Sequence, residues 1–372
     1  MKFLFTCGGT AGHVNPALGV AAKLAEIMPD SKFLFVGAEG MMETELVPRA
    51  GYDIKTIKIT NVSRSLSIKG LKHNIKTAKN ILAATGKAKR IIREFQPDAV
   101  IGTGGYVCYP VLSAAHALKI PTFLHESNAV PGLTTKMLAG KTDCVMVGFP
   151  EAAKNYKNGT NIVCTGTPVR SEFKPVSPTE GKRALGIPED KKLVLSVWGS
   201  LGAAHMNNIM ADFITLTAAD EKFGVIHSAG KRGYAAFMSA MDEKCPDFVD
   251  HSCEVREYIH DMPRIFAAAD LVMCRGGAST LAELIAMGKP AVIVPSPNVT
   301  ANHQGMNARV LERAGGAKVY LEGQFTAQSL YEEVSALLND EEKLQKMGEG
   351  MLSLATEDSA AKIAELIISR LA

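Results

Sequence analysis

The sequence predicts an α/β protein made of two doubly wound, Rossmann-like domains. Short β-rich runs alternate with helical patterns along the chain, which indicates parallel sheets covered by helices on both faces. The 372 residues are too many for one core, since domains average about 150 residues. A strand, a glycine loop and a helix follow one another at the N-terminus, and this order begins again near residue 193.

Five runs in the first half have the composition of buried parallel strands. The first leads through "CGGTAGH" into a helix, for which Asn15 is a suitable N-cap and Pro16 a suitable first-turn residue. We therefore expect that helix to begin at Asn15, and the first domain to end near residue 168. The five runs are KFLF (2–5), KFLFVGA (32–38), AVIGTGG (99–105), PTFLHE (121–126) and CVMVG (144–148).

The second half repeats the plan after a polar, proline-containing stretch at 166–192. Asp358 can cap a terminal helix with apolar residues at helical spacing, which we expect to pack back on the first domain. The predicted domains are 1–168 plus 352–372, and 169–351. The expected strands are LVLSVWG (193–199), FGVIHSAG (223–230), FVDHSCEVREYI (248–259), ADLVMCRGG (269–277), PAVIVP (290–295) and AKVYL (317–321).

The composition is that of a soluble protein, with 47% hydrophobic and 21% charged residues. The seven cysteines form no Cys-x-x-Cys pair and no metal-ligand spacing with histidine, so we interpret them as reduced thiols in the cytosol. The N-terminus turns into glycine after a short apolar run, unlike a signal peptide. Residues 99–118 lack Asp, Glu, Lys and Arg, but "GTGGY" and Tyr109-Pro110 favour strand, loop and helix over a membrane span.

Positive charge is concentrated between Asn61 and Arg93, where nine Lys or Arg occur without one acid. Aliphatic residues such as Leu71 and Ile75 alternate with these cations, a pattern suited to an anionic phospholipid surface. Nucleic acid is a weaker alternative, because the segment has no aromatic residue to stack on a base. The predicted membrane patch comprises Arg64, Lys69, Lys72, Lys76 and Lys79.

Glycines directly follow four expected strands, in the loops 7–13, 102–106, 198–203 and 274–279. Without a Cβ, backbone N–H groups approach a ligand closely, and the following helix directs its positive end at a phosphate. The chain lacks the G-x-G-x-x-G fingerprint after its first strand, the Walker motif and a D-x-D motif. A bound nucleotide diphosphate would therefore be neutralised by helix ends and cations such as Arg170 or Arg275, without a metal.

Six segments together resemble the bacterial N-acetylglucosaminyltransferase family that completes lipid II (the MurG family). They are GGTAGHVNPAL, GTGGYVCYPV, HESNAVPGLTTKMLA, TGTPVR, WGSLGAAHMN and CRGGASTLAELIAMGKPAVIVPSPNVTANHQGMNA, in order from residue 8 to 308. Ala11 stands where the family often has glycine, Cys108 where serine is usual, and His303 where a glutamine is common. The resemblance implies a GT-B fold, with the two domains facing across a cleft, the acceptor site in the N-terminal domain and the donor site in the C-terminal one.

The same resemblance implies an inverting transfer of GlcNAc from UDP-GlcNAc to lipid I, without a cofactor or an essential metal, at the cytoplasmic face of the cell membrane. His13, at a helix N-terminus that keeps its imidazole neutral, is the expected general base or orienter for the acceptor hydroxyl. Glu126 is the rival base, and a purely structural role for His13 in its loop stays open. Two other functions also stay open: a nucleotide-sugar epimerase of this fold and a non-catalytic nucleotide-sugar-binding protein.

The expected donor site draws on both domains. Four of its residues also have a structural alternative: a helix cap for Ser200, a solvated hinge for Arg170, an Asx turn for Asn128 and a half-buried acid for Glu283. Glu283 is expected to accept from the ribose hydroxyls, and Asn307 to support its loop. The resemblance implies that Ile259 contacts uracil through its backbone. The full set is Thr10, Gly12, Asn128, Arg170, Ser200, Ile259, Ala278, Ser279, Glu283, His303 and Gln304.

Overall fold

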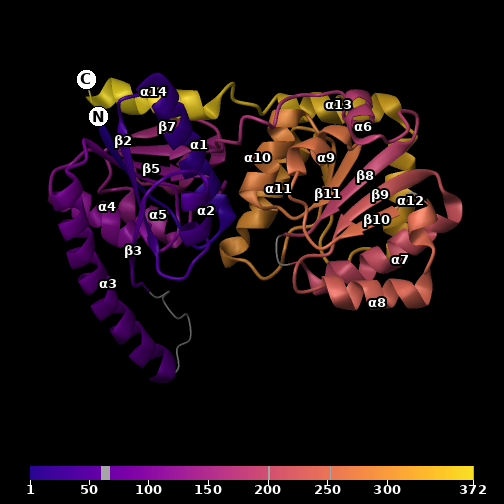
Figure 1. The fold of residues 1–372 in the computed structure, drawn as a ribbon, viewed down its shortest axis with the longest axis horizontal. Helices are drawn as coiled ribbons and strands as arrows, with labels where there is room; N and C mark the ends of the chain where they lie inside the picture. Colours follow the sequence, from indigo (N-terminus) through magenta and orange to yellow (C-terminus); the bar gives the residue numbers. More distant parts are fainter. Residues whose placement is uncertain (60–67, 200–201, 252, 372) are drawn as a thin grey trace. The chain divides into compact units, whose positions relative to one another are not determined.

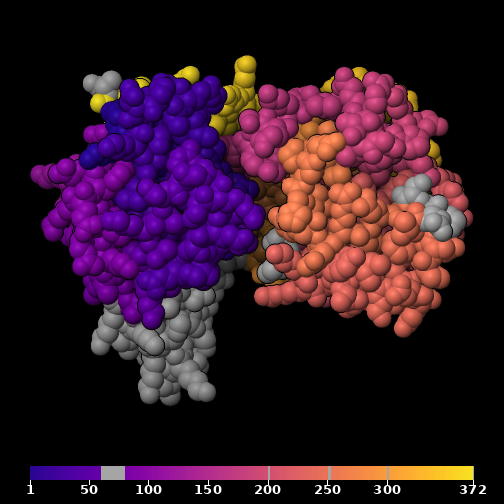
Figure 2. Space-filling view, viewed as in Figure 1, coloured from indigo at the N-terminus to yellow at the C-terminus, as the bar shows by residue number. Residues whose placement is uncertain are grey.

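The computed structural model describes residues 1–59, 68–199, 202–251 and 253–371, without the side chains of 68–79, 250, 251 and 300. Figure 1 shows the ribbon, and Figure 2 draws in grey the residues of uncertain placement. The chain forms two compact units, Met1–Arg170 with Thr356–Ala372, and Ser171–Ala355. The expected boundaries at 168 and 352 lie close to these.

The first unit is built on a seven-stranded parallel sheet in the order β3-β2-β1-β4-β5-β6-β7. Its register is continuous from strand to strand, with Phe5 opposite Phe35 on one side and Ile101 on the other. Side chains on both faces are buried, as the apolar runs predict. The strands are β1 (Lys2–Thr6), β2 (Lys32–Ala38), β3 (Ile54–Ile57), β4 (Ala99–Gly102), β5 (Thr122–Glu126), β6 (Cys144–Val147) and β7 (Ile162–Cys164).

Helices cover both faces of this sheet. On one face, α14 (Ser359–Leu371) contributes Ile363 and Ile367 to the core around Phe3 and Phe5, beside α1. Helix α14 packs against α1 at the edge of the first unit that carries the C-terminus (Figure 1), so the chain returns to this unit. On the other face lie α3 and α4. The remaining bounds are α1 (Ala11–Ile27), α2 (Glu43–Arg49), α3 (Ile68–Phe95), α4 (Cys108–Ala117), α5 (Leu133–Leu138) and the 3₁₀ helix η1 (Pro150–Asn155).

The expected start of α1 at Asn15 is wrong, because the helix begins four residues earlier. Gly9 has a φ of +85° and turns the chain within the loop, so Thr10 already occupies the N-cap position. The first helical bond follows at once, from Val14 N–H to Thr10 O at 3.2 Å. Pro16 therefore lies inside the helix, and His13 lies in its first turn.

The second unit contains a six-stranded parallel sheet in the order β10-β9-β8-β11-β12-β13. Its strands are β8 (Lys192–Val197), β9 (Phe223–Ser228), β10 (Cys253–Arg256), β11 (Leu271–Cys274), β12 (Ala291–Ile293) and β13 (Ala317–Val319). Its helices are α6 (Pro178–Leu185), α7 (Ala204–Asp220), α8 (Tyr234–Lys244), η2 (Phe248–His251), α9 (Met262–Ala268), α10 (Ala278–Met287), η3 (Thr300–Asn302), α11 (His303–Arg313), α12 (Ala327–Leu338) and α13 (Glu341–Leu352).

The prediction of a parallel α/β fold with two sheets is confirmed. Residues 99–118 form β4, a loop and α4 as expected. Within the described part of the chain, the helices are all too short or too polar to cross a bilayer. In both sheets the strand order reverses beside the first strand of the unit, between β1 and β4 and between β8 and β11. Ligands of open α/β sheets bind at the carboxyl end of such a switch point.

Candidate functional site

The loop after β1 fixes the imidazole of His13 in one tautomer. His13 Nδ1 lies 2.9 Å from Gly8 O, and the Thr10 hydroxyl is 3.4 Å away. A carbonyl oxygen can only accept, so Nδ1 carries the proton and Nε2 keeps its lone pair. The side chain is half-buried in the first turn of α1. This arrangement leaves Nε2 able to take a proton from a ligand hydroxyl.

The loop after β4 packs directly on the β1 loop. A Cβ on Gly104 would lie 2.5 Å from His13 Cδ2, and one on Gly105 would lie 2.4 Å from Gly8 O. Both glycines have positive φ, +119° and +90°. Only glycine therefore permits this approach. The Cys108 thiol, where the resembled family usually has serine, donates to Gly104 O at 3.0 Å and thus holds the loop as a hydroxyl would.

The carboxylate of Glu43 holds the loop after β1 in place, a role that the sequence did not predict. Its side chain is fully buried at the start of α2, and its two oxygens accept from Gly9 N–H at 2.9 Å and Ala38 N–H at 2.8 Å. A Cβ on Gly8 would lie 2.3 Å from Glu43 Oε1, which accounts for glycine there. An acid at the start of a short helix carries no distinctive spacing, so only the fold reveals this role.

Both carboxylate oxygens of Glu126, at the end of β5, accept hydrogen bonds from the loop that follows this strand. Oε1 accepts from the backbone N–H and the side-chain amide of Asn128, at 2.9 and 2.8 Å. Oε2 accepts from Gly132 N–H at 3.0 Å, and the residue is 5% exposed. The two bonds to Oε1 orient the side chain of Asn128, which is half-buried. The geometry favours an orienting role for Glu126 over that of a base.

The corresponding loop of the second unit lies between β11 and α10. Helix α10 begins at Ala278 without a side-chain cap, and the backbone N–H groups of Ala278 and Ser279 lie in its first turn. Asn307 donates to Gly276 O at 3.1 Å and supports this loop as expected. Gln304 accepts from Ser296 N–H at 2.8 Å, which fixes its amide beside the start of α11. A Cβ on Gly276 would lie 2.3 Å from Gln304 O.

Arg275 and Glu283 flank the same helix start. Arg275 pairs with Glu322, donates to Val294 O at 3.1 Å and lies over the Trp198 ring at 5.7 Å. Arg275 therefore serves the loops around β12 rather than standing free for a phosphate. Glu283 lies in the second turn of α10 and is half-buried. Burial, and to a lesser extent the charge of Glu283, raises the pKa of the Cys274 thiol to about 12.

The predicted residues fall into two groups, one in each unit. Thr10, Gly12, His13, Glu126 and Asn128 lie at the carboxyl edge of the first sheet, and Arg170 is the exposed last residue before the second unit. Ile259, which follows β10 and is 2% exposed, lies in the second unit with Ala278, Ser279, Glu283, His303 and Gln304. Ser200 and Arg64 lie outside the described residues, as do the side chains of Lys69, Lys72, Lys76 and Lys79.

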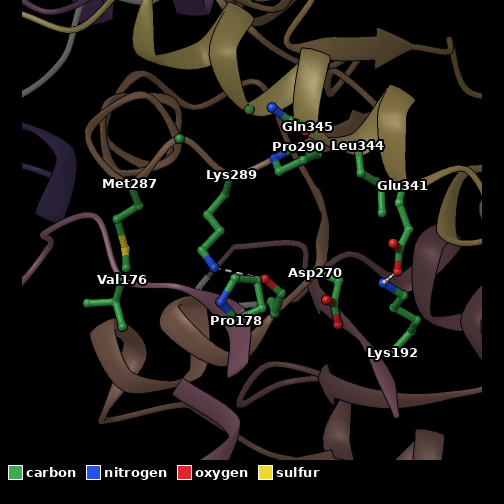
Figure 3. Close-up of a pocket in the computed structure, with 13 residues that line it drawn as sticks. Val176, Pro178, Lys192, Asp270, Met287, Lys289, Pro290, Glu341, Leu344 and Gln345 are labelled. Atoms are coloured by element: carbon green, nitrogen blue, oxygen red, sulfur yellow. Dashed lines mark hydrogen bonds and ion pairs between the residues drawn. The ribbon is translucent and has the colours of Figure 1, made fainter. Parts of the chain in front are cut away.

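A hollow of about 260 Å³ lies at the opposite edge of the second sheet (Figure 3). Lys192, Asp270 and Pro290, which line it, stand at the amino ends of β8, β11 and β12. Lys289 extends toward it and donates to Ala267 O and Ala269 O, at 2.7 and 2.9 Å. This hollow is therefore remote from the loop between β11 and α10 of the same unit. Among the described residues, His, Cys, Asp and Glu form no cluster of three that could hold a metal ion.

Two parallel-sheet units, each with glycine loops at the carboxyl edge of its sheet, have the architecture of the GT-B fold class. Residues 3–147 match the glycosyltransferase family 28 N-terminal domain, and residues 193–369 match the glycosyltransferase family 28 C-terminal domain. The chain belongs to glycosyltransferase family 28.

Similar proteins agree with this assignment. The UDP-N-acetylglucosamine–N-acetylmuramyl-(pentapeptide) pyrophosphoryl-undecaprenol N-acetylglucosamine transferase of Acetivibrio thermocellus is 42% identical over 99% of this chain and 97% of its own length. The crystal structure of Acinetobacter baumannii MurG is similar with a TM-score of 0.75, at 26% identity over 99% of both chains. A UDP-N-acetylglucosamine 2-epimerase structure from Listeria monocytogenes has a TM-score of 0.69 at 15% identity, over 99% of this chain and 96% of that one. This last likeness shows the fold alone.

Proposed function

We propose that this protein transfers GlcNAc from UDP-GlcNAc to the 4-hydroxyl of MurNAc in undecaprenyl-pyrophosphoryl-MurNAc-pentapeptide, converting lipid I to lipid II. The observation that carries this proposal is the 42% identity to a named transferase of that substrate pair along 99% of the chain. The oxygen of the acceptor hydroxyl attacks C1 of GlcNAc, the bond from C1 to the UDP oxygen breaks, and the configuration at C1 inverts. The hydroxyl proton leaves to a base, and UDP departs as the anion.

The acceptor side of this reaction is assigned to the first unit. His13 Nε2 accepts the proton of the 4-hydroxyl, because its Nδ1 is already committed to Gly8 O. Asn128, held by Glu126, reaches the donor from this unit and donates to hydroxyls of the transferred GlcNAc. Thr10, in the loop after β1, and Gly12, in the first turn of α1, also bind the donor from this unit.

Most of the donor side is assigned to the second unit. The N–H groups of Ala278 and Ser279 bind the transferred sugar and the adjacent phosphate, His303 and Gln304 bind sugar hydroxyls, and Glu283 accepts from the ribose. Ser200 and Arg170 contact the phosphates, and Ile259 contacts the uracil. Helix ends and cations neutralise the leaving UDP, so the reaction proceeds without a cofactor or an essential metal.

The decisive experiment supplies radiolabelled UDP-GlcNAc and a lipid I analogue, with identification of the disaccharide product. The proposal predicts a β-1,4-linked GlcNAc-MurNAc lipid and UDP, with turnover retained in excess chelator. Conversion of UDP-GlcNAc at C2 without acceptor would instead indicate an epimerase. Binding of UDP-GlcNAc with no product would indicate a non-catalytic protein.

Glu283→Ala is expected to raise the KM for UDP-GlcNAc by roughly 10- to 100-fold, the cost of losing hydrogen bonds to a charged acceptor, about 1.5–3 kcal/mol. The effect on kcat should be small, since the ribose bonds are present in both ground and transition states. Initial rates at varied donor concentration measure both constants. Glu332→Ala, an exposed acid on α12 of the same unit, is the matched control. An unchanged donor KM would return Glu283 to a structural role.

Peripheral attachment to the cytoplasmic face of the membrane completes the proposal, because the acceptor is lipid-linked. The basic segment supports it through composition, with nine cations and no acid between residues 61 and 93. Helix α3 spans most of this segment, and Leu82 on it is 74% exposed. An exposed leucine among cations suits the headgroup boundary of an anionic bilayer. The second half of α3 is anchored on the unit by buried Ile91 and Ile92.

Replacing Lys69, Lys72, Lys76 and Lys79 with glutamine should weaken binding to vesicles containing phosphatidylglycerol by more than about tenfold, since each basic residue near the surface is worth about 1 kcal/mol. Vesicle co-sedimentation at low and high salt measures the effect, which salt should diminish. The same charge is removed in a control by replacing the exposed lysines of the first unit, Lys58, Lys119, Lys154 and Lys157. Equal binding by both quadruple variants would refute a localised patch.

A further inference from the structure

One peptide group connects the buried Glu43 carboxylate to the His13 imidazole. The N–H of the Gly8–Gly9 peptide donates to Glu43 Oε2 at 2.9 Å. The C=O of that same peptide accepts from His13 Nδ1 at 2.9 Å. The three groups therefore form a chain of two hydrogen bonds, carboxylate to peptide to imidazole.

Each end of this chain is fixed by the surrounding structure. Glu43 is fully buried, and its second oxygen accepts from Ala38 N–H at 2.8 Å at the end of β2. The ring of His13 lies against Gly104, where even one Cβ would come within 2.5 Å of it. Neither side chain can turn away without losing these contacts. The peptide is thus held between them.

A carboxylate at the N–H end of a peptide makes the oxygen at the other end a stronger acceptor, because hydrogen bonds in a chain polarise one another. The Gly8 oxygen in turn bonds the Nδ1–H of His13 more strongly when the ring becomes an imidazolium. Negative charge at Glu43 therefore stabilises the protonated ring that forms when Nε2 takes a proton. A carboxylate bonded directly to Nδ1 has the same effect in hydrolase triads.

We propose that Glu43 is a positioning residue for His13, acting through the Gly8–Gly9 peptide to fix the Nδ1–H tautomer and to stabilise the imidazolium formed during glycosyl transfer. The inference rests on the proposed role of His13 as base. Glu43 itself does not touch the substrate, since its side chain is fully buried.

Other ionisable groups near Glu43 leave it as the dominant local charge. Burial, with a smaller contribution from the charge of Glu43, raises the pKa of the Cys7 thiol well above its usual value and that of Cys108 to about 12, so these thiols are neutral near pH 7. On α2 itself, Glu45 and Arg49 are exposed and lie within 3.9 Å of each other. Glu39, which follows β2, is exposed and pairs with Lys87.

An NMR titration tests the coupling without any turnover. Ring-¹⁵N-labelled histidine reports the tautomer and titration midpoint of His13, assigned by the loss of its signal in His13→Ala. Glu43→Gln should lower that midpoint by up to about one pH unit, a smaller shift than a charge in direct contact produces. The matched control is Glu45→Gln, which removes a charge from the same helix. An unchanged midpoint and tautomer in folded Glu43→Gln would overturn the proposal.

A double-mutant cycle separates this role from general support of the fold. Glu43→Gln should lower kcat by roughly 10- to 100-fold, the scale known for outer partners of metal-bound histidines, with little change in donor KM. In the His13→Ala background the same change should have no further effect on kcat, because residues that act as a unit are not additive. Equal losses in both backgrounds would show that Glu43 acts on the fold alone. Full activity of His13→Ala would instead refute the proposed base, whatever the NMR result.

Discussion

Replacing His13 with alanine is expected to lower kcat by about 10²- to 10⁴-fold, the usual contribution of a positioned general base. The imidazole is well placed for this role, because Nδ1 is bonded to Gly8 O at 2.9 Å and Nε2 retains its lone pair. The dissociation constant of UDP-GlcNAc should hardly change, since His13 is assigned to the acceptor hydroxyl and not to the donor. Single-turnover rates with a lipid I analogue, together with donor binding by calorimetry, measure the two quantities separately.

The pH profile gives a second readout for the same change. In the wild type the acid limb of kcat reports protonation of the base in the enzyme–substrate complex. This limb should flatten in His13→Ala. His116→Ala, an exposed histidine at the end of α4, is the matched control and should keep both rate and profile. If the kcat of His13→Ala stayed within about threefold of the wild type, His13 would supply almost none of the usual contribution of a general base. Proton transfer would then be assigned to another group or to water.

Local sequence patterns were sufficient for the central strands and failed at the edges of the first sheet. The apolar runs such as "KFLF" and "CVMV" are buried on both faces, so composition alone identifies them. Strands β3 and β7 were missed because they are short edge strands, with sequences IKTI and IVC, that are only partly buried. Their pairing depends on neighbours far along the chain, which no local pattern encodes.

The site shows the same division between local and long-range information. Glycines after strands predicted which loops matter, because a missing Cβ is visible in the sequence. The contact of Gly104 with the His13 ring joins segments about ninety residues apart, as does the bond from Thr103 to His13 O. Glu43 was overlooked for the same reason. Its function appears only when the end of β2 lies beside the loop after β1.

Asp270→Asn is expected to lower the free energy of unfolding of the second unit by about 3–5 kcal/mol, the cost of breaking a buried ion pair. Asp270 Oδ2 accepts from Lys182 Nζ at 2.8 Å and from Leu193 N–H at 2.7 Å. Lys182, Asp270 and the neighbouring Lys289 are 2%, 8% and 3% exposed. The neutral amide would leave two buried ammonium groups without a counter-charge.

The destabilisation should be smaller at alkaline pH. Burial, opposed by the charge of Asp270 and assisted by that of Lys182, lowers the pKa of Lys289 to about 8. In the unfolded chain the Lys289 ammonium keeps its proton up to about pH 10.4. Between about pH 8 and that value the unfolded state therefore binds more protons than the folded state, and the free energy of unfolding rises with pH. Loss of Asp270 lowers the pKa of Lys289 in the folded state further, which widens the pH range over which stability rises. The variant therefore recovers part of its deficit near pH 9.5.

Trp198, the single tryptophan, allows the second unit to be followed alone, since it is 2% exposed in that unit's core. Its fluorescence during urea unfolding at pH 7 and pH 9.5 gives the two free-energy differences. Glu342→Gln is the control, because it removes an exposed i,i+4 pair with Lys346 that is worth only about 0.3–0.5 kcal/mol. If Asp270→Asn were no more destabilising than this control, the buried lysines must already be neutral at pH 7. The ion pair would then contribute little to the fold.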